Sequence, residues 1–474
     1  MKIVILWTDA MIFVLLAAML IGAWIIRRRP HLLLPWQRVA RSAAGMVSLL
    51  VLSLFVLVGL LDTLHYRVAL PDKSAGHTVY SPEVLSAFDT LAGGLRSRTE
   101  KTYSAPLAAY LYAKESIETA DGKTLRDYPR LRYGGAHLQN PENEWTGDVV
   151  QRTLFGALYG LLGGALIAAC GIYLLRCRKT AEGTRASFGA ALSGVARSAP
   201  CRAVTIAILL LGALIGITAN LSAAYHVLGT DKVGQDVLYL ALKSIRTGLV
   251  IGTVTTLVML PFALLLGIAA GYLRGWVDDA IQYLYTVLSS IPSVLLIAAA
   301  VLMMQVYIEM HADWFETAAE RADLRLLFLC LILGVTSWTG LCRLLRGETL
   351  KLRELEYIQA AQAFGVSSFR ILMRHIVPNV MHIVLIAVVM DFSALVLAEA
   401  VLSYVGVGVD PTTMSFGTLI NAARLEMGRD PVVWWTLAAA FGFMLVLVLV
   451  LAANLFADAV RDAFDPRLNR TEAV

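Results

Sequence analysis

The segment LRELEYIQAAQAFG at residues 352–365, followed by RHIVPN at 374–379, separates two long apolar runs of the chain. It is polar and rich in alanine and glutamine, which favour helix. A glycine at position 365 favours a helix end, and Pro378 favours a new helix start. The pattern predicts two short helices with a turn, joined on both sides to membrane-spanning helices. Such an element can dock on a soluble partner; a plain amphipathic connector is the alternative.

The runs on either side belong to a series of nine that are long enough to cross a membrane. A span takes roughly 20 apolar residues to cross about 30 Å of hydrocarbon. The runs lie at 7–26, 44–61, 154–175, 203–220, 248–272, 284–308, 325–342, 380–405 and 433–455. Of 474 residues, 58% are hydrophobic and only 16% are charged, whereas soluble domains carry about 25% charged residues. The sequence predicts an all-α polytopic membrane protein with about nine transmembrane helices.

Basic residues predict the orientation. They gather in the loops 27–43, 176–202 and 343–379, which fall on one side of a nine-span chain. Because Lys and Arg accumulate in cytoplasmic loops, the N-terminus is expected outside and the C-terminus in the cytoplasm. The first span is expected to be a retained anchor, since its arginines follow the apolar run instead of preceding it.

The only sizeable polar region, 62–152, then lies outside the cytoplasm. Ser81, Pro82 and Glu83 are typical of a helix start, and apolar residues at helical spacing follow over 84–95. Asp121-Gly122 favours a hairpin turn. These features predict a small extracytoplasmic α+β insert, with a loosely packed segment as the alternative.

No motif for catalysis or for a bound cofactor emerges. The five cysteines include no close pair, and the eight histidines are scattered. The sequence therefore predicts no enzyme activity, no metal site, no cofactor and no nucleic-acid partner.

Polar residues inside the apolar runs are candidates for a solute pathway. Asp391 and Glu399 lie eight residues apart in the run 380–405, and therefore close to one helix face. A charge in lipid is costly and marks either a pathway or a structural pair; both alternatives stay open. Pro292 lies inside the run 284–308, where a proline frees backbone carbonyls that cavity water or neighbouring helices must satisfy.

The loop 343–379 closely resembles the EAA loop of ABC-importer permeases, in the form found in dipeptide, oligopeptide and nickel permeases. Four further segments are similar to motifs of that family and follow in the same order. They are HVLGTDKVGQDVL (226–238), GYLRGWVD (271–278), AEAVLSYVGVG (398–408) and RDAFDPRL (461–468). The region over which the five motifs are distributed makes up a little over half of the chain.

The resemblance implies a type I ABC importer permease core of six helices over 203–468, with 343–379 as its coupling loop. Residues 1–202 would be an N-terminal extension with three transmembrane helices and the insert 62–152. An alternative division makes 44–61 the first core helix and 154–220 an inserted hairpin. The implied location is the bacterial cytoplasmic (inner) membrane, which the chain would cross several times.

The resemblance also implies roles for individual residues. Coupling to the ATPase is assigned to Glu356, Ala360, Ala361, Gly365, His375, Pro378 and Asn379. An extracytoplasmic motif is assigned to Gly229, Thr230, Asp231, Gly234 and Asp236. Two positions depart from the family pattern: its first motif glutamate is Gln359 here, and its outer arginine is Gln235.

The implied function is import of peptides or peptide-like solutes. The chain would be a non-catalytic permease subunit that forms half of the pathway together with a second permease subunit. One or two cytoplasmic ABC ATPases would hydrolyse ATP, and an extracytoplasmic solute-binding protein would deliver the solute. Two other functions remain open: an ion-coupled carrier acting alone, with Asp391 and Glu399 as relays, or a permease-derived membrane scaffold or sensor.

Overall fold

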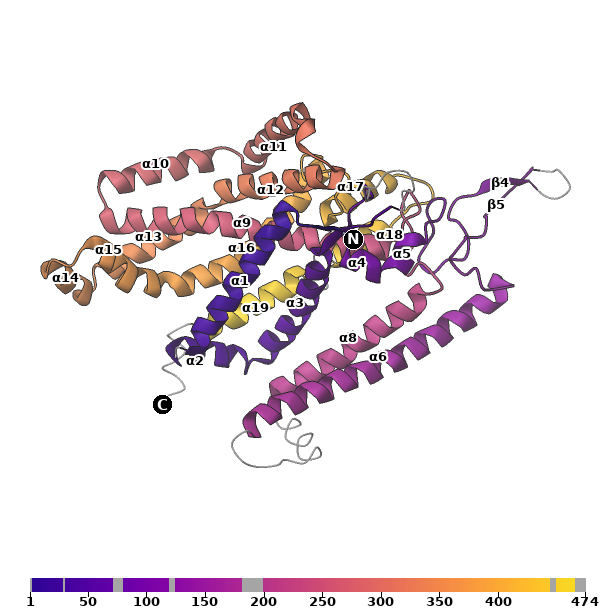
Figure 1. Ribbon diagram of the computed structural model, residues 1–474, viewed down its shortest axis with the longest axis horizontal. Helices are drawn as coiled ribbons and strands as arrows, with labels where there is room; N and C mark the ends of the chain where they lie inside the picture. Colours follow the sequence, from indigo (N-terminus) through magenta and orange to yellow (C-terminus); the bar gives the residue numbers. More distant parts are fainter. Residues whose placement is uncertain are drawn as a thin grey trace.

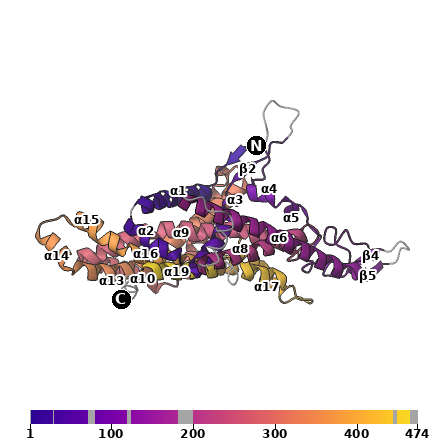
Figure 2. The same ribbon diagram turned by 90° about the horizontal axis from the view of Figure 1, so that it is seen from below.

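The computed structural model describes residues 2–28, 30–70, 80–118, 124–180, 199–443 and 449–464. Long helices form an elongated bundle (Figures 1 and 2). Helix α14 (Glu356–Ala363) lies at one extreme, which we call the α14 end. The hairpin of β4 (Glu115–Glu118) and β5 (Thr124–Asp127) lies at the other, which we call the insert end.

Eight helices in the described part of the chain are long and apolar enough to cross a membrane. They are α1 (Trp7–Arg28), α3 (Ala43–Asp62), α6 (Pro141–Thr180), α8 (Ala199–Ser222), α9 (Val237–Leu273), α11 (Ser293–Met310), α12 (Ala318–Ser337) continued by α13 (Thr339–Arg353), and α15 (Ser368–Ile371) continued by α16 (Val377–Val405). The predicted all-α membrane architecture is confirmed. The ninth run, 433–455, includes residues 444–448, which lie outside the described residues, between α18 (Trp435–Phe441) and α19 (Leu449–Phe464).

The prediction of one continuous helix over 284–308 is wrong. Helix α10 (Trp276–Ser290) ends before Ile291, and α11 begins after Pro292. A proline disfavours helical backbone in the residue before it. Ile291 is accordingly extended, with φ −87° and ψ 132°. The proline therefore separates two helices instead of kinking one.

The polar region 62–152 contains strands and short helices, as predicted. Strands β1 (Lys2–Val4), β2 (His65–Arg67) and β3 (Leu85–Ser86) form an antiparallel sheet. Strands β4 and β5 pair on either side of 119–123, so the predicted turn at Asp121-Gly122 lies outside the described residues.

The helix predicted to start near Ser81 begins later. Helix α4 (Ala87–Leu91) is capped by Ser86, whose hydroxyl accepts from the Asp89 amide while the Asp89 carboxylate accepts from the Ser86 amide. Leu85 pairs with β2 and is therefore extended. A reciprocal capping box outweighs the weaker start signal upstream. A second short helix, α5 (Gly93–Ser97), follows.

Helix α9 is the centre of the packing. It contacts α3, α12, α13 and α16, and contributes to four apolar clusters. Gly267 and Gly271 allow α13 to approach closely, because added Cβ atoms would lie 2.8 Å from the Cys342 carbonyl oxygen and 2.6 Å from the Thr349 Cβ. The position of α13, and of the α14 end beyond it, is thereby tied to α9.

Helices α6 and α8 form an antiparallel hairpin beside this bundle (Figure 1). Their seam is lined by glycines: an added Cβ at Gly160 would lie 2.1 Å from the Gly212 carbonyl oxygen, and one at Gly216 would lie 2.3 Å from that of Gly156. Small residues let membrane helices approach closely. Helix α3 packs against both α9 and α8.

Candidate functional site

Helix α14 forms the tip of the α14 end. It begins at Glu356, ends at Ala363, and is followed by Gly365 with φ +76°. Side chains other than glycine are strained at that φ. No atom would lie within 4 Å of an added Cβ, so glycine is required here by backbone conformation and not by crowding. The turn directs the chain into α15.

The two faces of this tip differ. Ile358 is fully buried in the cluster that contains Leu345 and Ile371, and Ala361 packs against the same cluster. On the other side Phe364 is 87% exposed, accompanied by exposed Tyr357 and Phe369. Exposed apolar groups gathered in this way mark an interaction site.

A small polar latch joins α14 to the start of α16. The amide of Asn379 donates to the Tyr357 hydroxyl (3.2 Å) and to the His375 carbonyl oxygen (2.7 Å). The Tyr357 and His375 rings lie 5.9 Å apart between centroids. The structure therefore brings together two predicted coupling residues and Tyr357, which the sequence prediction omitted although it stands next to Glu356.

The remaining predicted coupling residues occupy different surroundings. Glu356, Ala360, Gly365 and Pro378 are exposed, whereas Ala361 is half-buried. The amide of Gln359 donates to the Glu354 carbonyl oxygen at 3.3 Å. This departure from the family pattern thus gives a local contact at the start of the helix.

The turn 271–278 contacts α13, the helix that leads to the tip. Arg346 of α13 donates two hydrogen bonds to Asp278, at 2.6 and 2.7 Å. Hydrogen bonds from this guanidinium hold the pKa of Asp278 below its usual value. Arg274 pairs with Glu354 at 2.5 Å, so the turn holds both the middle and the end of α13.

The loop 226–236, at the insert end, is largely buried, with Lys232 and Val233 exposed. The hydroxyl of Thr230 donates to the Thr102 carbonyl oxygen (2.8 Å) and accepts from the Ser104 amide (2.6 Å). Asp231 accepts from the backbone amides of Val233 and Gln235 and so shapes the turn. The motif predicted to be extracytoplasmic is therefore bound to the insert of the same chain.

A buried ion cluster fixes the same loop. Asp236 caps α9 by accepting from the Leu238 amide, and it lies 2.7 Å from His226 Nδ1. Glu100 of the insert lies 3.4 Å from His226 Nε2 and accepts from three backbone amides of 132–134. Burial lowers the pKa of His226, but its contacts with Asp236 and Glu100 outweigh burial and raise it to about 9.

Burial alone would raise the pKa of Glu100, but the hydrogen bonds that it accepts lower it to about 2. The two glycines of the motif allow the close approach. Gly229 and Gly234 have φ +72° and +80°, and an added Cβ at Gly234 would lie 2.0 Å from the Glu100 carbonyl oxygen. No larger residue fits at position 234 without displacing the insert.

The three predicted pathway residues have different surroundings. Glu399 is buried and accepts from the Ser403 (2.6 Å) and Ser415 (2.9 Å) hydroxyls, which joins α16 to α17 (Phe416–Glu426). These contacts favour the structural alternative for Glu399. The Asp391 carboxylate has no hydrogen-bond or ion-pair partner within the described residues, and Pro292 is exposed at the helix break.

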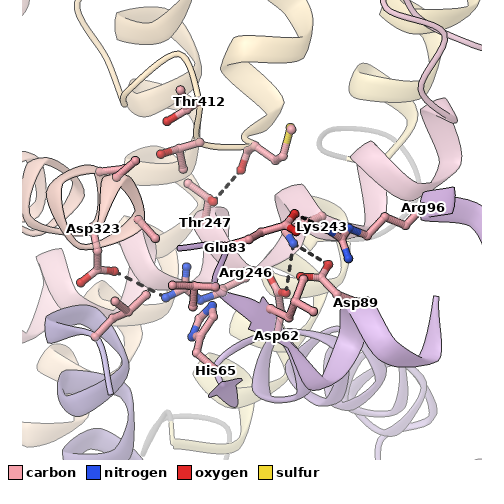
Figure 3. A pocket seen from close by; sticks show the side chains of 18 of the residues that line it. Asp62, His65, Glu83, Asp89, Arg96, Lys243, Arg246, Thr247, Asp323 and Thr412 are labelled. Carbon is pink, nitrogen blue, oxygen red and sulfur yellow. Dashed lines mark hydrogen bonds and ion pairs between the residues drawn. The ribbon is translucent and has the colours of Figure 1, made fainter. Parts of the chain in front are cut away.

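A charged cavity near the start of α9 was missed by the sequence prediction. Its volume is about 630 Å³, and Figure 3 shows its charged walls. Arg246 Nη2 lies 2.6 Å from Asp9 and 3.5 Å from Asp323, so α1, α9 and α12 meet there. Asp9 also lies 2.7 Å from His65 Nδ1.

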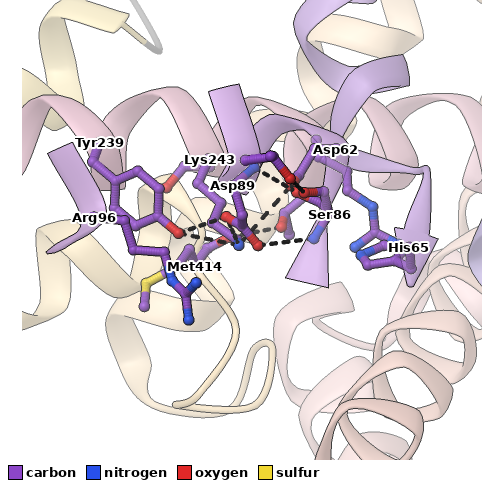
Figure 4. A network of polar contacts seen from close by, with 12 residues as sticks. Asp62, His65, Ser86, Asp89, Arg96, Tyr239, Lys243 and Met414 are labelled. Atoms are coloured by element: carbon purple, nitrogen blue, oxygen red, sulfur yellow. Dashed lines mark hydrogen bonds and ion pairs between the residues drawn. The ribbon is translucent and has the colours of Figure 1, made fainter. Parts of the chain in front are cut away.

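A second part of the same wall contains Lys243. Its Nζ lies 2.5 Å from Asp89, which also accepts from the Tyr239 hydroxyl at 2.6 Å, and Ser86 donates to Asp62 (Figure 4). The sequence signal for these residues was a set of isolated charges in or beside apolar runs. Their partners are up to 315 positions away in the chain, so local sequence could not pair them.

Comparison with known proteins places these features in a family. A family model described as "Binding-protein-dependent transport system inner membrane component" matches residues 263–470. The oligopeptide transport system permease protein OppC of Mycobacterium tuberculosis is 36% identical over 241 residues, 51% of this chain and 76% of that protein. The glutathione transport system permease protein GsiD of Pectobacterium atrosepticum is 32% identical over 243 residues, 51% of this chain and 73% of that protein. The dipeptide transport system permease protein DppC of Lactococcus lactis is 28% identical over 242 residues, 51% of this chain and 64% of that protein.

Proposed function

Because the chain belongs to the family of binding-protein-dependent transport system inner membrane components, we propose that it is the permease subunit of an ATP-driven importer for peptides or peptide-like solutes. Family members are transport components of the inner membrane and not enzymes. The proposed partners are a second permease subunit, one or two ABC ATPases in the cytoplasm, and an extracytoplasmic solute-binding protein. The names of the relatives, which refer to oligopeptides, glutathione and dipeptides, support the solute class.

The observation that carries the proposal is the bare apolar tip at α14. Exposed Tyr357, Phe364 and Phe369 can enter a groove of an ATPase, while buried Ile358 anchors the helix to α13. Movement of the ATPase would reach the membrane helices through this anchor and through the latch of Tyr357 with Asn379. Burial of exposed aromatic anchors is the usual source of interface energy.

The proposed orientation has the α14 end in the cytoplasm and the insert end outside. The basic segment around α2 (Pro30–Val39) supports it, because Trp36 and Val39 pack against the last turn of α19. Arg27, Arg28 and Arg38 therefore lie at the same end as the helix that leads to the C-terminus. This arrangement matches the enrichment of basic residues on the cytoplasmic side.

The proposed domain division follows the packing. Helix α3 with α9 to α19 would form the core that pairs with the second permease subunit. Helix α1, the insert and the α6–α8 hairpin would be additions to it. If the core begins at 203, deletion of the α6–α8 hairpin removes a core helix. Under the alternative division, the same deletion leaves the core whole.

The experiment is ATP-driven uptake by the complex reconstituted in vesicles, comparing wild type with Phe364→Ala. We expect the variant to lose at least tenfold in uptake and to release the ATPase during purification. Leu166→Ala is the matched control, since Leu166 is 73% exposed on α6, outside the tip. Unchanged uptake and ATPase recovery in Phe364→Ala would contradict the proposal, and uptake by the purified chain alone under an ion gradient would support the carrier.

A further inference from the structure

The charged cavity described above is enclosed jointly by the additions and the core. From the additions come residues around β2, β3 and α4; from the core come the starts of α9 and α12 and the loop before α17. Its volume of about 630 Å³ lies within the range of small-molecule sites, roughly 300–1,000 Å³. The cavity is therefore large enough for a small solute at the insert end.

Groups of both signs line the cavity, and the Arg246 side chain retains unused hydrogen-bonding capacity. Asp62 is 3% exposed; its Oδ1 accepts from Ser86 and lies 4.0 Å from Lys243 Nζ. Arg246 is 9% exposed and donates through Nη2, whereas Nε has no acceptor. Buried polar groups of this kind are costly unless another group satisfies them.

The more accessible part of the wall repeats this pairing of charges. Lys243 and Arg96 are 25% and 33% exposed, and Glu83 is 63% exposed. Apolar contact is supplied by Val84, Leu95 and Met414. The lining therefore contains ion pairs, Glu83 with Arg96 and Asp89 with Lys243, beside apolar surface (Figure 3). A solute with an ammonium and a carboxylate group would exchange partners with these pairs.

Gln235 gives this wall a neutral group where the resemblance leads us to expect an arginine. Its side chain lines the cavity and has no hydrogen-bond partner in the described residues. A guanidinium at this position would add a positive charge beside Lys243 and Arg96. The amide instead leaves a donor and an acceptor free for a solute.

We infer that this cavity is a binding site for a small zwitterionic solute of the dipeptide type. Asp62 and Glu83 would receive the ammonium group, and Lys243, Arg96 and Arg246 the carboxylate. The choice of a peptide-like solute rests on the proposed function, whereas the pairing of charges rests on the cavity itself. The site differs from the binding protein's own site, because it is built from this chain alone.

The test is direct binding of L-alanyl-L-alanine to the purified permease complex without the solute-binding protein, measured by calorimetry. We expect saturable binding at one site per chain. The N-acetyl dipeptide lacks the ammonium group and the dipeptide amide lacks the carboxylate, so each should bind at least tenfold more weakly. Equal affinity for all three probes would overturn the inference.

Two variants locate the site. Asp62→Asn should weaken dipeptide binding at least tenfold, but it also touches the contact with Ser86. Ala319→Trp fills the cavity from α12 and should abolish binding, whereas Ala136→Trp, exposed on the insert away from the cavity, should leave it unchanged. Undiminished binding in Ala319→Trp, or no saturable binding to wild type, would overturn the inference.

Uptake separates this inference from the proposed function. Normal ATP-driven uptake by a complex whose cavity binds no dipeptide would overturn the site and leave the importer standing. Specific binding in the cavity without ATP-driven uptake would support the site and count against the importer.

Discussion

The tip at 356–365 and the loop at 226–236 both resemble motifs of one family, yet their side chains lie in opposite surroundings. At the tip, Phe364 is 87% exposed and Gly365 has open space around it. In the loop, Thr230 is fully buried and Asp236 is 2% exposed. The two segments therefore differ in kind: one leaves apolar side chains exposed at the tip, and the other holds the chain's own insert.

This contrast has an energetic counterpart. Removing one member of a buried polar cluster leaves its partners unsatisfied, which typically costs about 1–3 kcal/mol and more for charged groups. Changes to exposed side chains usually stay within about 0.5 kcal/mol. The loop should therefore respond to mutation through stability, and the tip through transport.

Gly234→Val should have the largest effect on stability. The new Cβ would lie 2.0 Å from the Glu100 carbonyl oxygen at a φ of +80°, which combines overpacking with backbone strain and should cost at least about 3 kcal/mol. Thermal unfolding of the purified chain would show it as a large drop in Tm or a loss of folded protein. Gly428→Val is the matched control, because an added Cβ there meets no atom within 4 Å. An equal drop in Tm for the two variants would contradict the prediction.

A change of pH should produce the next largest effect at the loop. The raised pKa of His226, about 9, means that the folded state holds a proton that the unfolded state releases near pH 6.5. The resulting stability is complete below about pH 6.5 and lost as pH rises through 9, by up to about 3 kcal/mol. Tm measured from pH 6 to 9.5 should fall in wild type and vary less in His226→Gln. If Tm falls with pH by the same amount in both proteins, His226 is not the cause of the pH dependence.

At the tip, Gly365→Val should lower the free energy of unfolding by about 1–2 kcal/mol, because valine is strained at the φ of +76°. Gly365→Asn should cost less, because asparagine tolerates left-handed backbone better than a β-branched residue does. Comparing Tm for the two variants tests this ranking. A larger loss for Asn than for Val would show that the left-handed backbone conformation does not govern the effect of substitution at this turn.

Phe364→Ala should have the smallest effect on stability, within about 0.5 kcal/mol, because the ring is 87% exposed. The same variant is expected to lose uptake, so stability and transport should separate at this residue. A Tm drop comparable to that of Gly234→Val would show that the tip is a structural element like the loop.

Much of the fold was predictable because apolar runs report membrane helices directly. The runs at 7–26 and 44–61 differ from α1 and α3 by at most two residues at either end. The helix break at Ile291 was missed because hydropathy stays high across Pro292, although the backbone constraint there was readable. The later start of α4 was missed because the capping box of Ser86 with Asp89 is a short pattern beside a more conspicuous Ser-Pro-Glu sequence.

The sites were predictable to different degrees. Residues of the tip could be carried over from a motif, and Tyr357 was omitted although it lies among them. The cluster of His226 with Glu100, and that of Arg246 with Asp9 and Asp323, join segments far apart in sequence. No local periodicity encodes such pairs, because they depend on how the insert and α1 pack against the core.

Helix α9 has a mechanical consequence. It runs unbroken for 37 residues, from its cap at Asp236 to the turn after Leu273, which at about 1.5 Å per residue is a rod of about 55 Å. A tilt of about 5° at one end of such a rod moves the other end by about 5 Å. Tyr239, Lys243 and Arg246 stand near its Asp236 end, so a small rotation of α9 about its Leu273 end would displace these residues by the length of a whole side chain.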